Sequence, residues 1–233
     1  MSMLGIYPHT YKKLPYDPVA DVTPVSLGVV FDMGFAVGPQ VPASVKTVPE
    51  FLEWCKAYPT GANFGSPAPG SVPHFVGELI SRAGKVDMRH VGFRGSQPAI
   101  LDRLGGQIAA VSAPVGEFLP HLQGGKLRVL ATSGATRNKF VPGVSTLVEQ
   151  GLQDMVYGEW FGFFLPGKAP AEVVQKVNIA IRTALADKDV VAGLAAMGLE
   201  ARSSTPAELA ALLKADGDKW GPIVKAIGFT AES

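Results

Sequence analysis

The stretch Asn63-Phe64-Gly65-Ser66-Pro67-Ala68-Pro69-Gly70-Ser71-Val72-Pro73-His74 carries the strongest local signals in the chain. It predicts the end of a strand, a tight loop and the start of a helix. Ser71 is the expected N-cap, and Pro73 suits the first helical turn, where its missing N–H would have no partner. Small residues let backbone N–H groups approach a ligand, and the helix start adds partial positive charge. The stretch is therefore a candidate site for a phosphate or a carboxylate, although a structural turn without any ligand fits the same residues.

A phosphate-binding P-loop is a poorer match to this stretch. The spacing Gly65-x4-Gly70-Ser71 resembles part of that motif. A P-loop has a lysine between its second glycine and the hydroxyl residue, and here Ser71 follows Gly70 directly. The motif alone leaves the anion site and the structural turn as equal alternatives.

Strand and helix signals alternate around the stretch. From Ala62 to Ser133 the pattern predicts three strand–helix pairs and a final strand, which indicates a parallel sheet with helices on its faces. Ligands of such sheets bind outside the carboxyl ends of the strands. Because Asn63–His74 lies at such an end, its position favours binding over a turn.

Local signals also predict the other elements of the chain. Val22–Val37 reads as one or two buried strands, Tyr157–Phe164 as a strand, and the segment before Pro24 as a connecting loop. Two capping boxes, Thr47-x-x-Glu50 and Thr205-x-x-Glu208, each predict a helix start. The expected helices are Val48–Ala57, Val72–Ala83, Ser96–Gly105, Val115–Leu122, Ser145–Gln150, Ala171–Ala186, Val190–Met197 and a last helical region that ends near Gly228.

Composition narrows the function classes. The chain has 233 residues, 47% hydrophobic and 18% charged, with a net charge of +1 and scattered lysines and arginines. These values are typical of a globular protein and give no support to a nucleic-acid groove or a polybasic membrane patch. The single cysteine, Cys55, is expected to be a buried apolar side chain, and the four histidines are too far apart in sequence for a zinc site. We expect no metal, no cofactor and no catalytic residue.

Several stretches in order along the chain resemble one family. The chain is similar to the extracytoplasmic solute receptors of tripartite tricarboxylate transporters, the Bug-type periplasmic binding proteins. The matching stretches are Leu14–Pro18, Asp21–Leu27, Val45–Glu50, Asn63–Ser66, Gly70–His74, His90–Gly95, Leu104–Gln107, Leu119–Leu122, Gly124–Arg128, Trp160–Gly162 and Pro170–Val174. Because they follow one another over nearly the whole chain, together they are far more specific than any single motif.

The resemblance implies an α/β, two-lobed periplasmic-binding-protein-like fold with mostly parallel sheets flanked by helices. Residues 1–39 with 163–233 would form lobe one, and residues 40–162 would form lobe two, which carries the loop. Family members carry a further N-terminal stretch with a signal peptide and the first β-α units, so the resemblance also implies that lobe one is incomplete at its N-terminus. The stretch Met1–Pro8 has neither the charged n-region nor the apolar h-region of a signal peptide, so we expect a periplasmic location from the resemblance alone.

The resemblance also implies a function and a set of ligand-binding residues. The chain would be a solute-binding receptor for a small organic carboxylate that feeds the membrane permease subunits of a transporter. Ser112-Ala113 stands where the family often has an aspartate for a ligand's amino group, which favours a plain carboxylate over an amino acid. The ligand-binding residues carried over from the family are Ser66, Pro67, Ala68, Gly70, Ser71, Phe93, Ala113 and Thr132.

Two alternatives and one partner remain open at this stage. A hydrolase acting on a small anionic metabolite would use Ser66 or Ser71 as nucleophile and His74 or His90 as base. A non-binding remnant or interaction module would follow from the incomplete clamp. An incomplete lobe one exposes a strand edge and apolar surface, so we expect a homodimer through that lobe.

Overall fold

The chain forms two compact units in a computed structural model that describes residues 1–231. Unit 1 comprises Met1–Phe31 and the chain from Glu159 onward, and unit 2 comprises Asp32–Gly158. The chain passes from unit 1 to unit 2 within strand β1 (Val22–Val37), after Phe31. It returns to unit 1 at the start of strand β6 (Gly158–Pro166), after Gly158. The expected boundaries were 1–39, 40–162 and 163–233, so the first boundary lies eight residues and the second four residues earlier than expected. Whether the units act as ligand-clamping lobes stays a proposal.

The sheet of unit 2 has four strands that run parallel to one another and one strand, β1, that runs antiparallel to them. Its order is β3-β2-β4-β1-β5, in which β2 pairs in parallel with β3 and β4, while β1 is antiparallel to both β4 and β5. The strands are β2 (Asn63–Ser66), β3 (Arg89–Gly92), β4 (Ala110–Pro114) and β5 (Arg128–Thr132). The prediction of an α/β fold with mostly parallel strands is confirmed.

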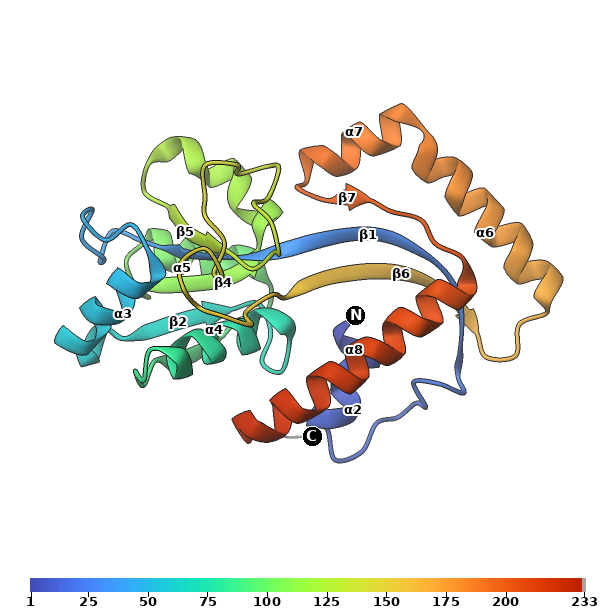
Figure 1. The fold of residues 1–233 in the computed structure, drawn as a ribbon, viewed down its shortest axis with the longest axis horizontal. Coiled ribbons are helices and arrows are strands. Elements are labelled where there is room, and N and C mark those ends of the chain that lie inside the picture. The colour runs from blue at the N-terminus through green and yellow to red at the C-terminus, as the bar shows by residue number, and fades with distance from the viewer. Residues whose placement is uncertain (232–233) are drawn as a thin grey trace. The chain divides into compact units, whose positions relative to one another are not determined.

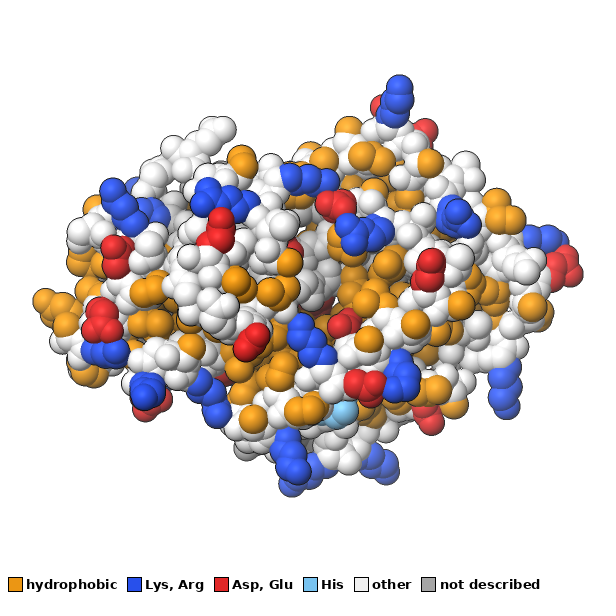
Figure 2. Space-filling model, in the orientation of Figure 1, with side chains coloured by type: hydrophobic (Ala, Val, Ile, Leu, Met, Phe, Trp, Pro, Cys, Tyr) orange, Lys and Arg blue, Asp and Glu red, His pale blue; other side chains and the backbone are white. Residues whose placement is uncertain are grey.

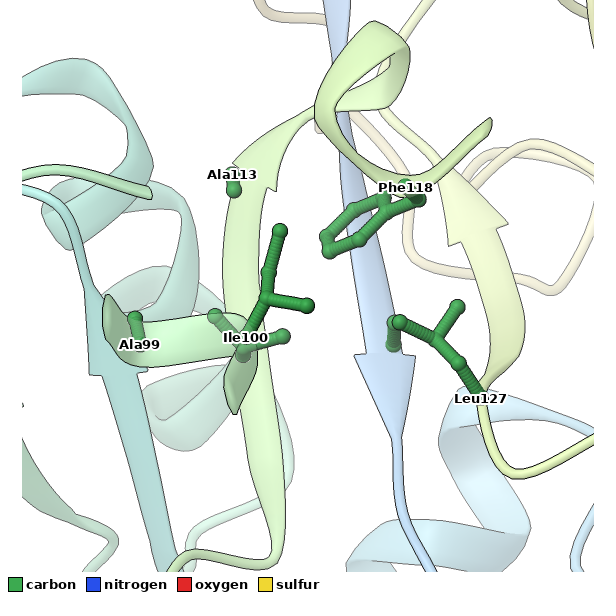
Figure 3. Packing of buried hydrophobic residues seen from close by; sticks show 7 residues of the cluster. Ala99, Ile100, Ala113, Phe118 and Leu127 are labelled. Atoms are coloured by element: carbon green, nitrogen blue, oxygen red, sulfur yellow. The ribbon is translucent and has the colours of Figure 1, made fainter. Parts of the chain in front are cut away.

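Helices cover both faces of this sheet and bury its apolar side chains. They are α3 (Val48–Ala57), η1 (Pro59–Gly61), α4 (Val72–Ala83), α5 (Ser96–Leu104) and the 3-10 segment η2 (Val115–Gly124). Ala99, Ile100, Ala113, Phe118 and Leu127 belong to one buried cluster (Figure 3). A Cβ on Gly34 of β1 would stand 2.8 Å from the Phe118 ring, so this glycine lets η2 lie close over the strand.

Unit 1 consists of helices packed on the first part of β1 and on β6. Its elements are α1 (Ser2–Gly5), α2 (Tyr7–Thr10), α6 (Ala171–Ala186), α7 (Lys188–Ala196), β7 (Glu200–Ala201) and α8 (Pro206–Ile227). Strands β1 and β6 lie side by side, and β7 pairs with β1 (Figure 1). Helix α8 starts at the Thr205 capping box and ends at Gly228, whose φ of +74° favours glycine.

Three local predictions are wrong, each for an identifiable reason. The segment before Pro24 is not all loop: α1 and α2 lie in it, and Pro8 occupies the first turn of α2, where proline is tolerated. Residues 145–150 form no helix: Thr146 makes an isolated bridge to Thr132, and the turn closed by the reciprocal Thr146–Glu149 bonds ends at Gly151, which takes φ +87°. Residues 115–124 are a 3-10 helix rather than an α-helix, and Pro120 within it has no N–H to donate.

Candidate functional site

The predicted site residues of unit 2 lie near the carboxyl ends of its parallel strands. β2 ends at Ser66, β3 at Gly92, β4 at Pro114 and β5 at Thr132. Parallel strands bring these ends to one edge of the sheet. The Ser66–Ser71 loop, defined here as those six residues, leaves β2 at this edge and leads into α4.

Two backbone hydrogen bonds, one within the loop and one to the segment after β3, hold the Ser66–Ser71 loop in place. The Ser71 amide donates to the Ala68 carbonyl at 3.3 Å, which closes a turn, and Gly70 takes φ +76°, a conformation that favours glycine. The loop is anchored to the segment after β3, because the Phe93 amide donates to the Ser66 carbonyl at 2.9 Å. The loop is therefore a fixed turn.

Ser71 does not make the side-chain cap expected of it, and His74 instead bonds back to the loop before the helix. Ser71 stands at the N-cap of α4, but its hydroxyl donates to the Ala68 carbonyl at 2.6 Å and does not cap the helix. His74 Nδ1 instead accepts the Gly70 amide at 3.0 Å, and His74 Nε2 lies 3.6 Å from Glu78 Oε1. Because an amide can only donate, Nδ1 is unprotonated, and a neutral imidazole carries its proton on Nε2.

Two amides at the loop and the helix start have no hydrogen-bond acceptor among the described residues. Those of Gly70 and Ser71 are used within the loop. Over the described part of the chain, the amides of Ala68 and of Val72, the first residue of α4, donate to no protein acceptor. Val72 is the first residue of the 12-residue helix α4, where the backbone dipole favours negative charge, and Ala68 lies in the loop four residues before it.

His90 bonds to Ser66 on the opposite side of the loop. Ser66 Oγ lies 2.8 Å from His90 Nε2, and the His90 ring stacks on His74 with centroids 3.8 Å apart. Burial, reinforced by the neighbouring His74, lowers the pKa of His90 to about 4. Any attraction for an anion at neutral pH thus comes from amides and the helix start rather than from a charged His90.

The structure brings Phe93 to the loop but buries the two remaining candidates. The Phe93 ring is half-buried beside Gly65, where a Cβ would stand 2.8 Å from its Cε2. Ala113 and Thr132 lie on the two strands that flank Gly34 of β1, each opposite that residue, and both are fully buried. Thr132 Oγ1 has no hydrogen-bond partner among the described residues.

Sequence reasoning did not find a carboxylate at the same edge of the sheet. Asp32 is half-buried where β1 enters unit 2, and its Oδ2 accepts a 2.8 Å hydrogen bond from Asn138 Nδ2. A Cβ on Gly134 would stand 2.7 Å from that carboxylate oxygen, so only glycine fits there. The signal was present in the sequence as an Asp inside an apolar strand, but its pairing with Asn138 depends on the fold.

Two other kinds of site receive no support from the described residues. No group of three or more His, Cys, Asp or Glu side chains among them is close enough to hold a metal ion. No helix that the structure describes is long and apolar enough to cross a lipid bilayer.

Comparison with known proteins identifies the family. Residues 1–229 match the model of the tripartite tricarboxylate transporter family receptor. The chain belongs to this family. The predicted membership is therefore confirmed over nearly the whole sequence.

Individual relatives agree with this assignment. Protein BugT of Bordetella pertussis is 28% identical, and the match covers 92% of this chain but 65% of BugT. A solved periplasmic transporter has a TM-score of 0.90 at 33% identity, covering 98% of this chain and 76% of its own. MatC from Rhodopseudomonas palustris, solved with bound malate, has a TM-score of 0.85 at 29% identity, covering 96% and 76%. The chain thus spans just under two thirds of the length of BugT.

Proposed function

We propose that the chain is a periplasmic solute-binding receptor for a small organic carboxylate, which it delivers to the membrane permease subunits of a tripartite tricarboxylate transporter. The observation that carries the proposal is the pair of donors at Ala68 and Val72, set at the edge where parallel strands end. A carboxylate has two acceptor oxygens, which suit two backbone amides at a helix start. The malate bound in MatC, a solved structure similar to this chain, supports this ligand class.

The proposed ligand contacts are made by the loop and by Phe93. Ala68 and Val72 donate to the carboxylate, Pro67 and Ser66 shape the approach, and Gly70 and Ser71 hold the turn. Phe93 offers an apolar surface for the ligand's carbon chain. Ala113 of β4 and Thr132 of β5 both lie opposite Gly34 of β1. We propose that they line the site in the ligand-bound state.

Isothermal titration with malate, and with a panel of di- and tricarboxylates, tests the proposal. The expected result is saturable 1:1 binding that is at least tenfold weaker in Ala68→Asp, because the new carboxylate repels the ligand. The matched control is Ala57→Asp on the exposed end of α3, which should bind like the parent. If no carboxylate binds, the chain is better described as an interaction module without a ligand.

Thermal shift provides an independent readout of the same binding. A ligand present at ten times its dissociation constant stabilises the folded state by RT ln(1 + [L]/Kd), about 1.4 kcal/mol. For a chain of this size each kcal/mol raises Tm by about 2–4 °C. A ligand identified by titration that leaves Tm unchanged would contradict specific binding.

The hydrolase alternative rests on the contact between Ser66 and His90. Their 2.8 Å separation is that of a nucleophile and its base. However, Ser66 is fully buried, the pKa of His90 is lowered to about 4, and within the described chain His90 has no carboxylate hydrogen-bonded to it. We infer that the pair is structural and that the receptor does no chemistry. Ester hydrolysis by the purified chain that disappears in Ser66→Ala would reverse this inference.

A homodimer through unit 1 remains a prediction. Multi-angle light scattering tests it directly, and a monomer at all accessible concentrations would remove it.

A further inference from the structure

Two arginines of unit 2 lie close together where its parallel strands begin. Arg128 is the first residue of β5 and pairs with Val37, the last residue of β1. Arg103 comes from α5, and its Nη1 donates to the Val37 carbonyl at 2.7 Å and to the Lys126 carbonyl at 3.0 Å. The pair therefore lies at the opposite edge of the sheet from the Ser66–Ser71 loop, which follows the end of a strand.

Three nitrogens of this pair are buried and have no acceptor among the described residues. They are Arg103 Nε, Arg103 Nη2 and Arg128 Nε. The acceptors that both guanidiniums do have are backbone carbonyls and not carboxylates. Arginine is almost never fully buried without a counter-charge, because removing its charge from water is costly. Arg103 is fully buried, so its charge has donors that the described residues leave unused.

Electrostatics at the pair agree with this geometry. Burial, reinforced by the positive charge of Arg128, lowers the pKa of Arg103 to about 10. An anion beside two guanidiniums would oppose both effects, because an opposite charge favours the charged form of each group. The pair is thus a place where a bound anion would be stabilised.

The unused donors of Arg103 belong to one edge of its guanidinium. The N–H of Nε and one N–H of Nη2 point in the same direction, and such a fork matches two oxygens of an oxyanion. Arg128 Nε adds a donor from a second guanidinium. Three donors and two positive charges suit a tetrahedral dianion, whose oxygens do not share one plane, better than a planar carboxylate or a halide.

The 38–45 segment, which leads from β1 toward α3, lies against the pair (Figure 1). Arg128 Nη2 donates to the Val41 carbonyl at 3.1 Å and to the Pro42 carbonyl at 2.9 Å. Within the segment, two amide-to-carbonyl bonds of 3.0 Å each close a turn of four residues. Because these bonds are local, the segment can shift without breaking the pairing of the strands. The three unused nitrogens are closed off from solvent, so an anion reaches them when this segment moves aside.

The surface of the molecule offers an anion weaker attraction than the pair. On the face shown in Figure 2, lysine and arginine side chains are scattered among acidic ones. The formal net charge of the chain is only +1. Exposed charges are also screened by salt, whereas buried ones are screened much less. A dianion is therefore attracted to the buried pair more than to the visible surface.

We propose that Arg103 and Arg128 form a binding site for a tetrahedral dianion, phosphate or sulfate, which is separate from the carboxylate site at the start of α4. Arg103 Nε and Nη2 donate to two oxygens of the anion, and Arg128 Nε donates to a third. The anion neutralises the two charges and links α5 to β5. It is a structural ligand of unit 2 and not the transported solute.

The experiment is an NMR titration of the uniformly ¹⁵N-labelled chain with sodium phosphate, at an ionic strength kept constant with sodium chloride. The Nε–H resonances of Arg103 and Arg128 should move downfield together along one saturable 1:1 curve, and sodium sulfate should give the same result. Arg89, which is exposed on β3, is the internal control, and its resonance should stay in place. The amide resonances of Ala68 and Val72 report any phosphate binding at the start of α4 separately.

Two variants test the fork itself. Arg103→Lys and Arg128→Lys keep the positive charge but remove Nε. Each should weaken phosphate binding at least tenfold, as read from the Nε–H resonance of the arginine that remains. Arg89→Lys is the matched control and should leave the affinity unchanged. If a variant does not fold, the titration of the parent chain decides alone.

Three results would overturn the proposal. The first is a parent chain in which the Arg103 and Arg128 resonances move no more than that of Arg89. The second is an equal response to sodium chloride alone, because a halide would then be sufficient. The third is phosphate affinity that is unchanged in both folded lysine variants.

Discussion

Replacing His74 by Phe tests whether this side chain holds the Ser66–Ser71 loop. His74 is 3% exposed, and its Nδ1 is the acceptor for the Gly70 amide at 3.0 Å. Phe keeps an aromatic ring, somewhat larger than imidazole, between Phe75 and His90, so the substitution removes the acceptor without opening a cavity. The 3.6 Å contact of His74 with Glu78 is long for a hydrogen bond and contributes little.

The expected loss follows from the buried amide. Leaving a buried N–H without an acceptor costs about 1–3 kcal/mol. At about 2–4 °C for each kcal/mol in a chain of this size, Tm should fall measurably. The effect should be local, because the loop loses the bond that fixes its turn at Gly70. Carboxylate affinity should fall with it, since the amides of Ala68 and Val72 lose their fixed spacing.

Thermal unfolding together with amide hydrogen exchange measures both parts of this prediction. In His74→Phe, the Gly70 amide should exchange faster than in the parent chain. His74→Asn is the matched control, because its carbonyl oxygen can replace Nδ1 as acceptor and should restore slow exchange at Gly70. Parent-like stability and unchanged Gly70 exchange in His74→Phe would refute the role given to His74.

Three further predictions concern unit 2. Gly77→Ala should be destabilised by about 1–3 kcal/mol in urea unfolding, because its Cβ would overlap the Phe64 ring where α4 packs on β2, and parent-like stability would show that α4 can shift at no cost. Burial raises the pKa of the Cys55 thiol to about 12, so iodoacetamide at pH 8 should label it only after unfolding; rapid labelling of the folded chain would contradict its burial. Burial lowers the pKa of His90 from 6.5 to about 4. As the pH falls, His90 is therefore protonated in the unfolded chain before it is protonated in the folded chain. The free energy of unfolding should therefore decrease as the pH falls from about 6.5 to about 4, and a pH profile that is unaltered in His90→Gln would exclude His90 as a cause.

The sequence predicted the elements whose boundaries are set by local chemistry. Thr47 and Thr205 form the predicted capping boxes, and Val72–Ala83 is a helix with the predicted limits. Each of these starts depends on side chains that bond within three or four residues, so local pattern suffices. Residues 145–150 show the limit of prediction from local pattern. They make the reciprocal Thr146–Glu149 bonds of a helix start, and yet no helix continues past Gly151.

The detailed geometry of the candidate site could not be predicted in the same way. The sequence located the loop, but it did not show that Gly70 and Ser71 use their amides internally, or that the hydroxyl of Ser71 turns to Ala68. The approach of His90 to Ser66 spans 24 residues and depends on the parallel pairing of β3 with β2. Such contacts are fixed by the tertiary fold, for which one sequence carries no local signal.

The central claim is that a carboxylate binds at the start of α4 through the amides of Ala68 and Val72. The most direct measurement is a ¹⁵N–¹H NMR titration of the labelled chain with malate, or with the tightest carboxylate found by calorimetry. The account predicts that these two amide resonances move downfield together along one saturable curve, while the Gly70 amide, already bonded to His74, moves little. A saturable titration in which the Ala68 and Val72 resonances stay in place would contradict it.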